Sequence, residues 1–386
     1  MVLLKHSFRK PFRTLPLGGV LLFTLSSLLS AEVVPFFNPM VQTTPYRTSF
    51  SMEGFIASDP VSLYDFFHDW QGKYSPRKGD NIALEAFRID MGIVLDEGYY
   101  FGYFFQKDTL IQTNRGFSDA YYALKNDLFP NEETSYELYL FIEAIQRHGL
   151  TLSRSFRLFE RGERHVDIAL GGYLSYDTQI QSGDVVGEGI LFPDESYSLW
   201  GEVDYFYEEN LLYGLNVENN YGIGYGFSFS SSYVDEASSF KARLIVNDLF
   251  ARSYWKHLPY SLVSIETENE SVGEDGYVSY DPTISGWELN EKYIHHFSPK
   301  YHLDIEKNLT QKSRLMVGYE YAYGLSMPYV KFLYEKERDT YSLRYESRFK
   351  SLGFGYEGEN LSFSLYSDGI KYASSFGFSL KYAYTF

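Results

Sequence analysis

The feature that most constrains this chain is a strict two-residue alternation that runs to its last position. Between positions 376 and 386 every second residue is apolar or aromatic, and the residues between them are Gly377, Ser379, Lys381, Ala383 and Thr385. Successive side chains of a β-strand point to opposite faces. The segment therefore predicts a strand with one apolar face and one polar face. The apolar face consists of Phe376, Phe378, Leu380, Tyr382, Tyr384 and Phe386.

A chain that ends on such a strand, with a terminal Phe and an aromatic residue two positions earlier, resembles bacterial outer-membrane β-barrels. The resemblance covers residues 81–386 and is one of architecture, so it points to no particular substrate. It implies that the six apolar residues are an insertion signal read by the barrel-insertion machinery. It also implies that the last strand pairs with the first, which removes both sheet edges, and that lipid surrounds the barrel.

The rest of the chain repeats the alternation. One predicted hairpin joins residues 87–95 to residues 99–105, and further alternating segments follow to the C-terminus, with a turn expected at 147–149. We count about 16 strands, within a range of 14 to 18, and an even number is expected when both termini lie in the periplasm. Tyr at many strand ends is typical of aromatic girdles. The predicted fold is all-β, a transmembrane antiparallel up-and-down barrel with short helical inserts.

The N-terminal part of the chain divides into two segments. Residues 1–31 have a basic start and a short apolar run, Val20 to Leu29, and are predicted to be a secretory signal peptide. Residues 32–80 contain five of the 13 prolines and are expected to be an irregular lead-in or a plug inside the barrel. Residues 81–386 form the predicted barrel. The predicted location is the outer membrane, reached by export through the periplasm.

Composition excludes several classes of protein. The chain has no Cys, which rules out disulfides and thiolate metal sites. Its formal net charge is −17, and loss of four basic residues with the signal peptide would make it −21 (30 basic minus 51 acidic residues). Nucleic acid is therefore not an expected partner, because phosphate binding needs a basic patch.

The polar face of the predicted strands carries many charges. Isolated charges on a lipid-facing surface are costly, so these side chains are expected to line the lumen. An acidic surplus there predicts a weak preference for cations. The alternative is a closed network of ion pairs. The predicted lumen charges are Arg88, Asp90, Glu137, Glu143, Asp167, Glu202, Asp204, Lys241, Arg243, Asp304, Glu306, Arg314, Glu320, Lys331, Glu335, Arg344, Glu346 and Lys381.

Two insertions interrupt the strands. Residues 248–298 are long and acidic, and resemble in length and charge the loop that narrows the bore of general porins; a solvated external loop is the alternative. Residues 107–133 contain a predicted helix at 118–127 and are expected on the periplasmic side, in the lumen or over its mouth, unless the strand count is wrong by one hairpin. The possible constriction residues are Glu266, Glu268, Glu270, Glu274, Asp275 and Asp281.

The resulting functional hypothesis is a water-filled, weakly cation-preferring channel for small solutes. The first alternative is a plugged barrel with a structural, adhesive or hydrophobic-solute transport role. The second is an outer-membrane enzyme that hydrolyses lipid or protein, which loss of activity on changing His165 or His257 would support. The sequence shows no nucleophile or zinc motif, so we expect no catalysis, cofactor or metal. It leaves the oligomeric state open.

Overall fold

The computed structural model describes residues 34–40, 47–95, 98–208, 220–267, 270–272, 278–280 and 284–385. The predicted signal peptide and Phe386 lie outside these ranges. Within them, no helix is both long and apolar enough to span a membrane. The two helices are short, α3 (Leu63–Phe67) and α4 (Arg115–Lys125).

The fold is dominated by one antiparallel sheet of sixteen strands, which confirms the predicted all-β class and strand number. A separate two-stranded sheet is formed by β9 (Glu270–Val272) and β10 (Val278–Tyr280). The strands of the main sheet are β1 (Arg47–Ser58), β2 (Asn81–Val94), β3 (Tyr99–Thr113), β4 (Thr134–Arg161), β5 (Arg164–Leu191), β6 (Tyr197–Tyr207), β7 (Gly222–Asp235), β8 (Phe240–Glu266), β11 (Ile284–His296), β12 (Lys300–Asn308), β13 (Ser313–Ala322), β14 (Leu325–Lys336), β15 (Asp339–Glu346), β16 (Ser351–Glu357), β17 (Leu361–Ser367) and β18 (Ser375–Thr385).

Fourteen of these strands close into a barrel. The ring runs through β1 to β5, then β7, β8 and β12 to β18, and β18 pairs with β1 from Arg47 opposite Thr385 to Ala57 opposite Ser375. The predicted closure of the barrel by the terminal strand is therefore confirmed. The remaining two strands, β6 and β11, lie outside the ring. β6 pairs with the C-terminal part of β5 and with the C-terminal part of β8, and β11 pairs with the C-terminal part of β8 on its other side.

The outer face of the barrel is apolar. Outward side chains such as Leu174, Val317 and Phe354 are exposed, whereas their neighbours in sequence point into the barrel. An apolar exterior with every ladder closed is the arrangement that lets a sheet lie in lipid. Tyr319, Tyr334, Tyr341, Tyr345, Tyr382 and Tyr384 are among the exposed outward residues near strand ends.

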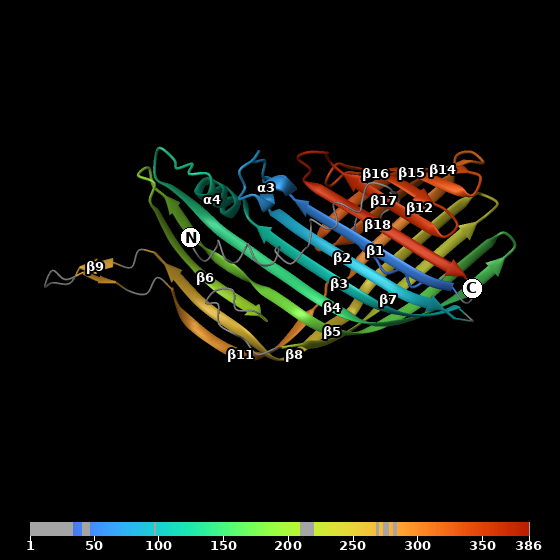
Figure 1. The fold of residues 1–386 in the computed structure, drawn as a ribbon, viewed down its shortest axis with the longest axis horizontal. Coiled ribbons are helices and arrows are strands. Elements are labelled where there is room, and N and C mark those ends of the chain that lie inside the picture. The colour runs from blue at the N-terminus through green and yellow to red at the C-terminus, as the bar shows by residue number, and fades with distance from the viewer. Residues whose placement is uncertain are drawn as a thin grey trace.

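The two ends of the barrel differ in the length of their loops. One end has tight turns, such as the one between β4 and β5, and also holds the start of β1 and the end of β18. The other end carries α3, α4 and the long insertion (Figure 1). Outer-membrane barrels have short periplasmic turns and long external loops. Residues 107–133 therefore belong to the outer end, which corrects the expected periplasmic placement.

That error has a specific origin. The expected lead-in contains a barrel strand, β1, so the barrel begins at Arg47 and not at Asn81. The turn expected at 147–149 is absent, because β4 runs without interruption from Thr134 to Arg161. Because β1 was missed, β2 and β3 were each assigned the wrong direction across the membrane. The false turn within β4 added one reversal of the chain, so β5 and the later strands were assigned the correct direction. These two errors offset one another in the strand number. β11 was also missed, because it lies in the predicted insertion, and the strand expected at residues 211–219 lies outside the described residues.

Beyond the barrel, a sheet extension continues from the same strands. We use this name for residues 134–143 of β4, 182–191 of β5, β6, 258–266 of β8 and 284–291 of β11. Figure 1 shows β9 at the far left, past the ends of β6 and β11 and away from the barrel. The described residues of β9, which include Glu270, therefore lie outside the bore, as the alternative of a solvated external loop expects. Glu266 ends β8, while Glu268, Glu274 and Asp281 lie outside the described residues, as does Asp275.

Candidate functional site

The lumen is occupied by residues 34–40, which we call the N-terminal strap. The N–H of Phe37 donates to Asn247 Oδ1 (2.9 Å), and Asn247 Nδ2 donates back to the Phe37 carbonyl (2.8 Å). On the opposite wall, Ser153 Oγ donates to the Pro39 carbonyl (3.0 Å). Val34 and Phe36 are fully buried. The strap is thus tied to β8 and β4, and it supports the sequence-based alternative of a luminal plug.

A double bulge in β8 makes this attachment possible. The register between β7 and β8 shifts twice near residues 247–251, and Asp248 and Phe250 have positive φ angles of 57° and 53°. An extra residue in one strand breaks its inward and outward alternation. As a result, two successive residues point into the lumen: Asn247 holds the strap, and Asp248 accepts hydrogen bonds from across the barrel.

Asp248 belongs to the first of two ion-pair networks in the lumen. Arg147 Nη2 donates to its two carboxylate oxygens (3.0 and 3.2 Å), and Tyr173 donates to Oδ1 (2.7 Å). Lys300 Nζ lies 3.9 Å from Asp248 and 3.2 Å from Asp108. Tyr323 also donates to Asp108 (2.6 Å). Since Arg147 is only 1% exposed, these charges are satisfied by one another instead of by water.

The same network extends to the wall formed by β2 and β3. Arg88 donates twice to Asp90 (2.6 and 2.7 Å) and once to Gln106 (2.7 Å), and Gln106 donates to Asp108 (2.6 Å). The guanidinium also lies 4.8 Å from the centre of the Phe104 ring. Polar side chains therefore form a continuous chain from β2 to β8 across the interior.

A second network lines the opposite wall. His302 lies between two carboxylates, 2.8 Å from Asp304 and 3.4 Å from Glu320. Arg243 donates to Asp304 (2.7 Å), and Arg344 donates to Glu320 (2.8 Å). The ring of Phe36 from the strap packs edge-on against His302, with centroids 5.5 Å apart. The strap thus covers this network.

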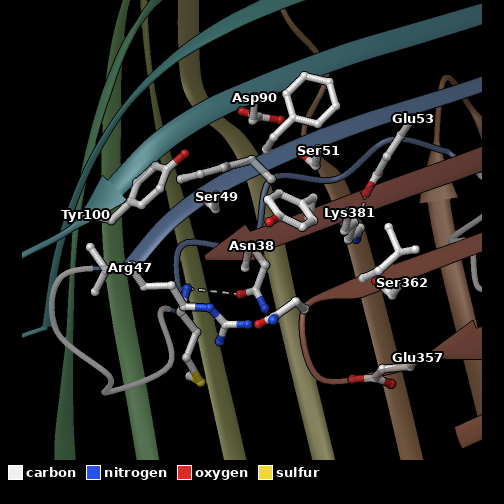
Figure 2. Close-up of a pocket in the computed structure, with 18 of the residues that line it drawn as sticks. Asn38, Arg47, Ser49, Ser51, Glu53, Asp90, Tyr100, Glu357, Ser362 and Lys381 are labelled. Carbon is white, nitrogen blue, oxygen red and sulfur yellow. Dashed lines mark hydrogen bonds and ion pairs between the residues drawn. The ribbon is translucent and has the colours of Figure 1, made fainter. Parts of the chain in front are cut away.

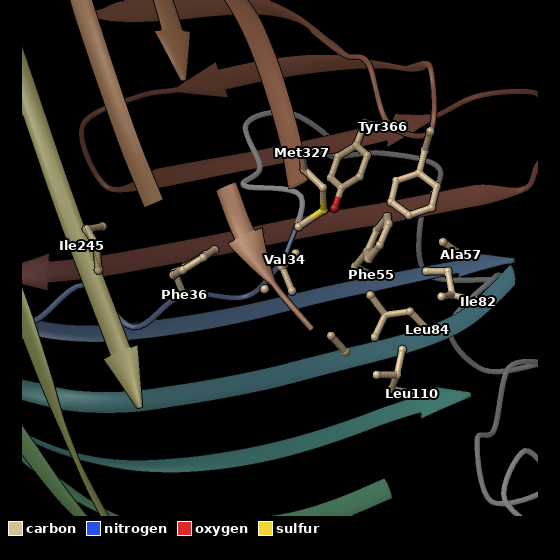
Figure 3. Close-up of a cluster of buried hydrophobic side chains, with 13 residues drawn as sticks. Val34, Phe36, Phe55, Ala57, Ile82, Leu84, Leu110, Ile245, Met327 and Tyr366 are labelled. Atoms are coloured by element: carbon tan, nitrogen blue, oxygen red, sulfur yellow. The ribbon is translucent and has the colours of Figure 1, made fainter. Parts of the chain in front are cut away.

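An apolar cluster closes the outer half of the lumen. Val34 and Phe36 pack there with side chains from opposite walls of the barrel, including Phe55 and Met327 (Figure 3). Such a packed, dry region has no room for a column of water. The other buried members are Ala57, Ile82, Leu84, Ala86, Leu110, Ile245, Ala322, Phe349 and Tyr366.

A cavity of ≈ 400 Å³ remains in the inner half of the lumen, between the strap and the seam of β1 and β18. Figure 2 shows side chains of β1, β2, β3 and β18 around it, with Asn38 of the strap. Phe36 and Phe37 give it an aromatic lid, and Glu53 pairs with Lys381 (2.6 Å) in its wall. Its volume is within the range of small-molecule sites in proteins.

Tyr100 shapes one side of this cavity. Its ring lies across Gly92 and Gly102, where a Cβ atom would approach the ring to 2.4 and 2.8 Å. A side chain at either position would force the Tyr100 ring to move from this place. Tyr100 also contacts the ring of Phe37, at 5.9 Å between centroids.

α3, α4 and the segment between them pack against the outward side of the wall at the outer end of the barrel, where Phe117 and Tyr121 lie in one apolar cluster with Ile111 and Leu138. Ser62 caps α3, and Asn114 caps α4 by accepting from the Phe117 N–H (2.8 Å). Tyr74 donates to Asp119 of α4 (2.6 Å). Burial, and then this carboxylate, hold the pKa of Tyr74 well above its usual value. The helices are therefore fixed to the outside of the wall beside the barrel mouth.

Six of the predicted lumen charges belong to these two networks, namely Arg88, Asp90, Arg243, Asp304, Glu320 and Arg344, and others form separate contacts. Arg314 pairs with Glu306 (3.0 Å), Lys241 lies 3.9 Å from the same carboxylate, and Glu346 accepts from two backbone N–H groups. Glu143 lies 3.9 Å from His295, and Lys331 stands opposite Arg344. Asp167 and Glu335 are at the inner rim, and Glu137 is at the outer rim.

Four of the predicted lumen charges lie in the sheet extension, with Glu137 and Glu143 on β4 among them. Glu202 and Asp204 are exposed on β6, in the sheet extension, because β6 is not part of the closed ring. Conversely, Arg147, Asp108 and Lys300 were not singled out from sequence, and Asp248 and His302 were not predicted to face the lumen. Arg147 sat in a predicted turn, and the bulge at Asp248 reverses the local parity that the prediction used.

The His residues suggested for a hydrolytic centre are far apart. His165 lies at the inner end, 3.6 Å from Asp167, whereas His257 is exposed in the outer part of β8. No group of three or more metal-ligating side chains is brought together in the ranges given above. The enzyme alternative therefore gains no assembled centre from these two residues.

No protein-family model and no curated protein sequence matches the chain. Among solved structures, one similar fold is that of the "TodX deltaS2S3 mutant monoaromatic hydrocarbon channel", with 8% identity, a TM-score of 0.47 and coverage of 94% of this chain and 98% of that one. The Ralstonia pickettii toluene transporter TbuX has 10% identity and a TM-score of 0.41, and covers 89% of this chain and 90% of its own. The Escherichia coli outer-membrane protease OmpT has 10% identity and a TM-score of 0.24, with 90% and 100% coverage.

Proposed function

We propose that the protein is a plugged outer-membrane barrel that passes small solutes toward the periplasm when the N-terminal strap leaves the lumen. In this account the chain is exported by its signal peptide and assembled by the barrel-insertion machinery. It acts as a conduit and not as an enzyme.

The observation that carries the proposal is the reciprocal pair of hydrogen bonds between Asn247 and Phe37. It joins two segments 210 residues apart with only one side chain. A typical hydrogen bond contributes about 0.5–1.5 kcal/mol to stability. A strap held by a few such bonds and by the packing of Val34 and Phe36 can detach without unfolding the barrel, because its own backbone is not part of the sheet.

The cavity under the strap suggests the class of solute. Aromatic rings of Phe36, Phe37 and Tyr100 line one side, and Glu53, Asp90 and Lys381 line the other. This mixture favours small molecules with an apolar body and a polar or charged end. The acidic surplus of the luminal side chains further favours cations over anions once the lumen is open.

The test is a comparison of planar-bilayer conductance between the intact protein and a variant that lacks residues 34–40. We expect the intact protein to stay mostly closed and the deletion variant to show sustained steps with a modest cation preference in a KCl gradient. The deletion must stop short of Arg47, because β1 begins there. Removing residues 32–80, which the sequence alone would suggest, would destroy the barrel seam.

The matched control is Asn131→Ala, which removes an exposed amide outside the barrel. Sustained conductance from the intact protein would favour the alternative of an open, weakly cation-preferring channel. A deletion variant that inserts and remains silent would refute transport through the lumen and leave a structural role.

A further inference from the structure

The cavity between the N-terminal strap and the seam of β1 and β18 has an ion pair in its wall. Lys381 Nζ lies 2.6 Å from Glu53 Oε1. The side chain of Glu53 is 8% exposed, whereas that of Lys381 is 42% exposed. Both residues line the cavity, and Figure 2 shows their charged ends close together. A buried carboxylate is therefore neutralised by an ammonium group that a molecule in the cavity can reach.

The strand registers place a serine on each side of Lys381. Ser51 of β1 is directly opposite Lys381, and Ser362 of β17 is directly opposite it on the other side. Both serines line the cavity. Directly opposed residues on one face of a sheet have Cβ atoms about 4.5–5.5 Å apart. One ammonium and two hydroxyl donors can therefore meet a single bound carboxylate, which is an acceptor for all three.

The opposite side of the same cavity is aromatic. Phe36 and Phe37 of the strap and Tyr100 of β3 line it, and the rings of Phe37 and Tyr100 lie 5.9 Å apart between centroids. The cavity volume of ≈ 400 Å³ is sufficient for one small molecule with an apolar part against these rings and a polar part at the ion pair.

The other charged residues of the cavity have partners of their own or are exposed. Asp90 accepts two hydrogen bonds from Arg88 (2.6 and 2.7 Å). Arg47 donates to the backbone carbonyl of Glu359 (3.4 Å). Glu357 and Glu359 are exposed at the inner end. Among the described residues, the pair in the wall is therefore the ion pair of which both members line the cavity.

The ion pair distinguishes solutes by the number of charges that they carry. A solute with a single charge takes one member of the pair and leaves the other without a partner, and an uncompensated buried charge is costly. A solute with one positive and one negative group exchanges with the pair instead. Its carboxylate accepts from Lys381 and its ammonium donates to Glu53, so that every charge keeps a partner.

We propose, on the basis of the transport function above, that this cavity binds a zwitterionic solute with an apolar side chain, of the α-amino acid class. The ammonium and carboxylate groups of the solute bind at Glu53 and Lys381, with Ser51 and Ser362 beside the carboxylate. Its side chain packs against the aromatic rings of the strap and of β3.

The test is calorimetric titration of the refolded, intact protein at neutral pH with three ligands that share a phenyl ring. L-phenylalanine carries both charges, 2-phenylethylamine only the ammonium and 3-phenylpropionate only the carboxylate. We expect L-phenylalanine to bind at least about tenfold more tightly than either single ion, because each single ion leaves one member of the pair without a partner. Glycine, which has both charges and no ring, should also bind at least about tenfold more weakly.

Two variants test the pair itself. Lys381→Gln and Glu53→Gln should each weaken binding of L-phenylalanine about tenfold. Their preference between the single ions should move in opposite directions, toward 2-phenylethylamine in Lys381→Gln and toward 3-phenylpropionate in Glu53→Gln. This preference is a ratio of affinities for one sample, so incomplete folding of a variant does not change it. The control Lys336→Gln removes an exposed ammonium on β14 and should leave every affinity unchanged.

Equal affinities of the intact protein for the three phenyl ligands would overturn the proposal, as would the same preference between the single ions in both variants. The titration requires no passage through the lumen, so its result is separate from that of the conductance test. Selective binding of L-phenylalanine by a protein whose strap-deletion variant stays silent would refute transport and leave the zwitterion site standing. Conductance of that variant without selective binding would refute the zwitterion site alone.

Discussion

The lumen and the sheet extension are built from the same long strands, yet they treat charge in opposite ways. Inside the barrel, Arg147 of β4 meets Asp248 of β8, and both side chains are buried. Farther along the same sheet, Asp184 of β5 faces Asp204 of β6, and both point to the exposed side. The inner charges are matched within the protein, and the outer ones are not.

This difference separates a region whose charges are buried from a region whose charges are accessible to solvent. Buried ions must be paired, because leaving one alone in a medium of low polarity is expensive. Exposed ions are solvated, so pairing or opposing them changes stability little. We therefore expect that removal of one partner of a luminal ion pair lowers the stability of the protein strongly. Removal of one of two opposed carboxylates in the extension should raise it slightly.

The largest effect is expected for Arg147→Ala. It leaves Asp248 buried beside Tyr173 without its guanidinium, and breaking a buried pair in this way costs about 3–5 kcal/mol. Urea unfolding followed by tryptophan fluorescence measures the loss. Arg154→Ala is the matched control on the same strand, because Arg154 is exposed and stacks on Tyr99 outside the lumen. Equal destabilisation by the two variants would contradict the pairing account.

A smaller, local effect is expected for Asn247→Ala. The change removes the acceptor for the Phe37 N–H and the donor to its carbonyl, at a cost of about 1–3 kcal/mol in docking of the strap. Hydrogen exchange of the amides of residues 36–40 should become faster, while exchange in β18 stays unchanged. If strap protection in this variant equals that in Asn131→Ala, Asn247 is not the latch.

The smallest effect is expected for Asp204→Asn, and it should be stabilising. Removal of one of two opposed carboxylates relieves about 0.2–1 kcal/mol in the extension at neutral pH. Because the pKa of Asp184 is raised in the folded protein, the folded state holds a proton that the unfolded chain has released, so stability falls as pH rises between the two pKa values. Below the usual Asp pKa both carboxyl groups are protonated and uncharged, so the stabilisation by Asp204→Asn should disappear there. Amide exchange in β5 and β6 at neutral and acid pH measures it, and a gain that persists in acid would argue against repulsion.

Period-two alternation was sufficient to predict the fold class, the closing pair and the lipid-facing residues, because these depend on side-chain parity alone. It could not reveal β1, which follows a proline-rich stretch and has Ser, Thr and Gly at several positions. The same pattern led to a false turn within β4 at Arg147, because a charged residue there was taken as the end of a strand. In the structure Arg147 is buried on the lumen face of a continuous strand.

The candidate site was less accessible from sequence for a related reason. Lumen residues such as Arg88, Asp304 and Glu320 follow regular parity and were identified. Asp248 follows a bulge, and the contact of the strap with β8 spans 210 residues. The local sequence pattern predicts neither the bulge nor this contact. The bulge depends on the partner strand, and the contact depends on closure of the barrel.

The most direct test of the central claim is a disulfide lock between the strap and the barrel wall. A Cβ atom built at Gly171 would lie 3.2 Å from the Pro39 Cβ, near the separation of about 3.5–4.5 Å that a disulfide needs. The chain has no native Cys, so Pro39→Cys with Gly171→Cys would form only this bond. Planar-bilayer recording of this double variant, with Pro39→Cys alone as control, should show no openings when oxidised and brief openings after reduction. Equal open times before and after reduction would contradict the claim that the strap gates the lumen.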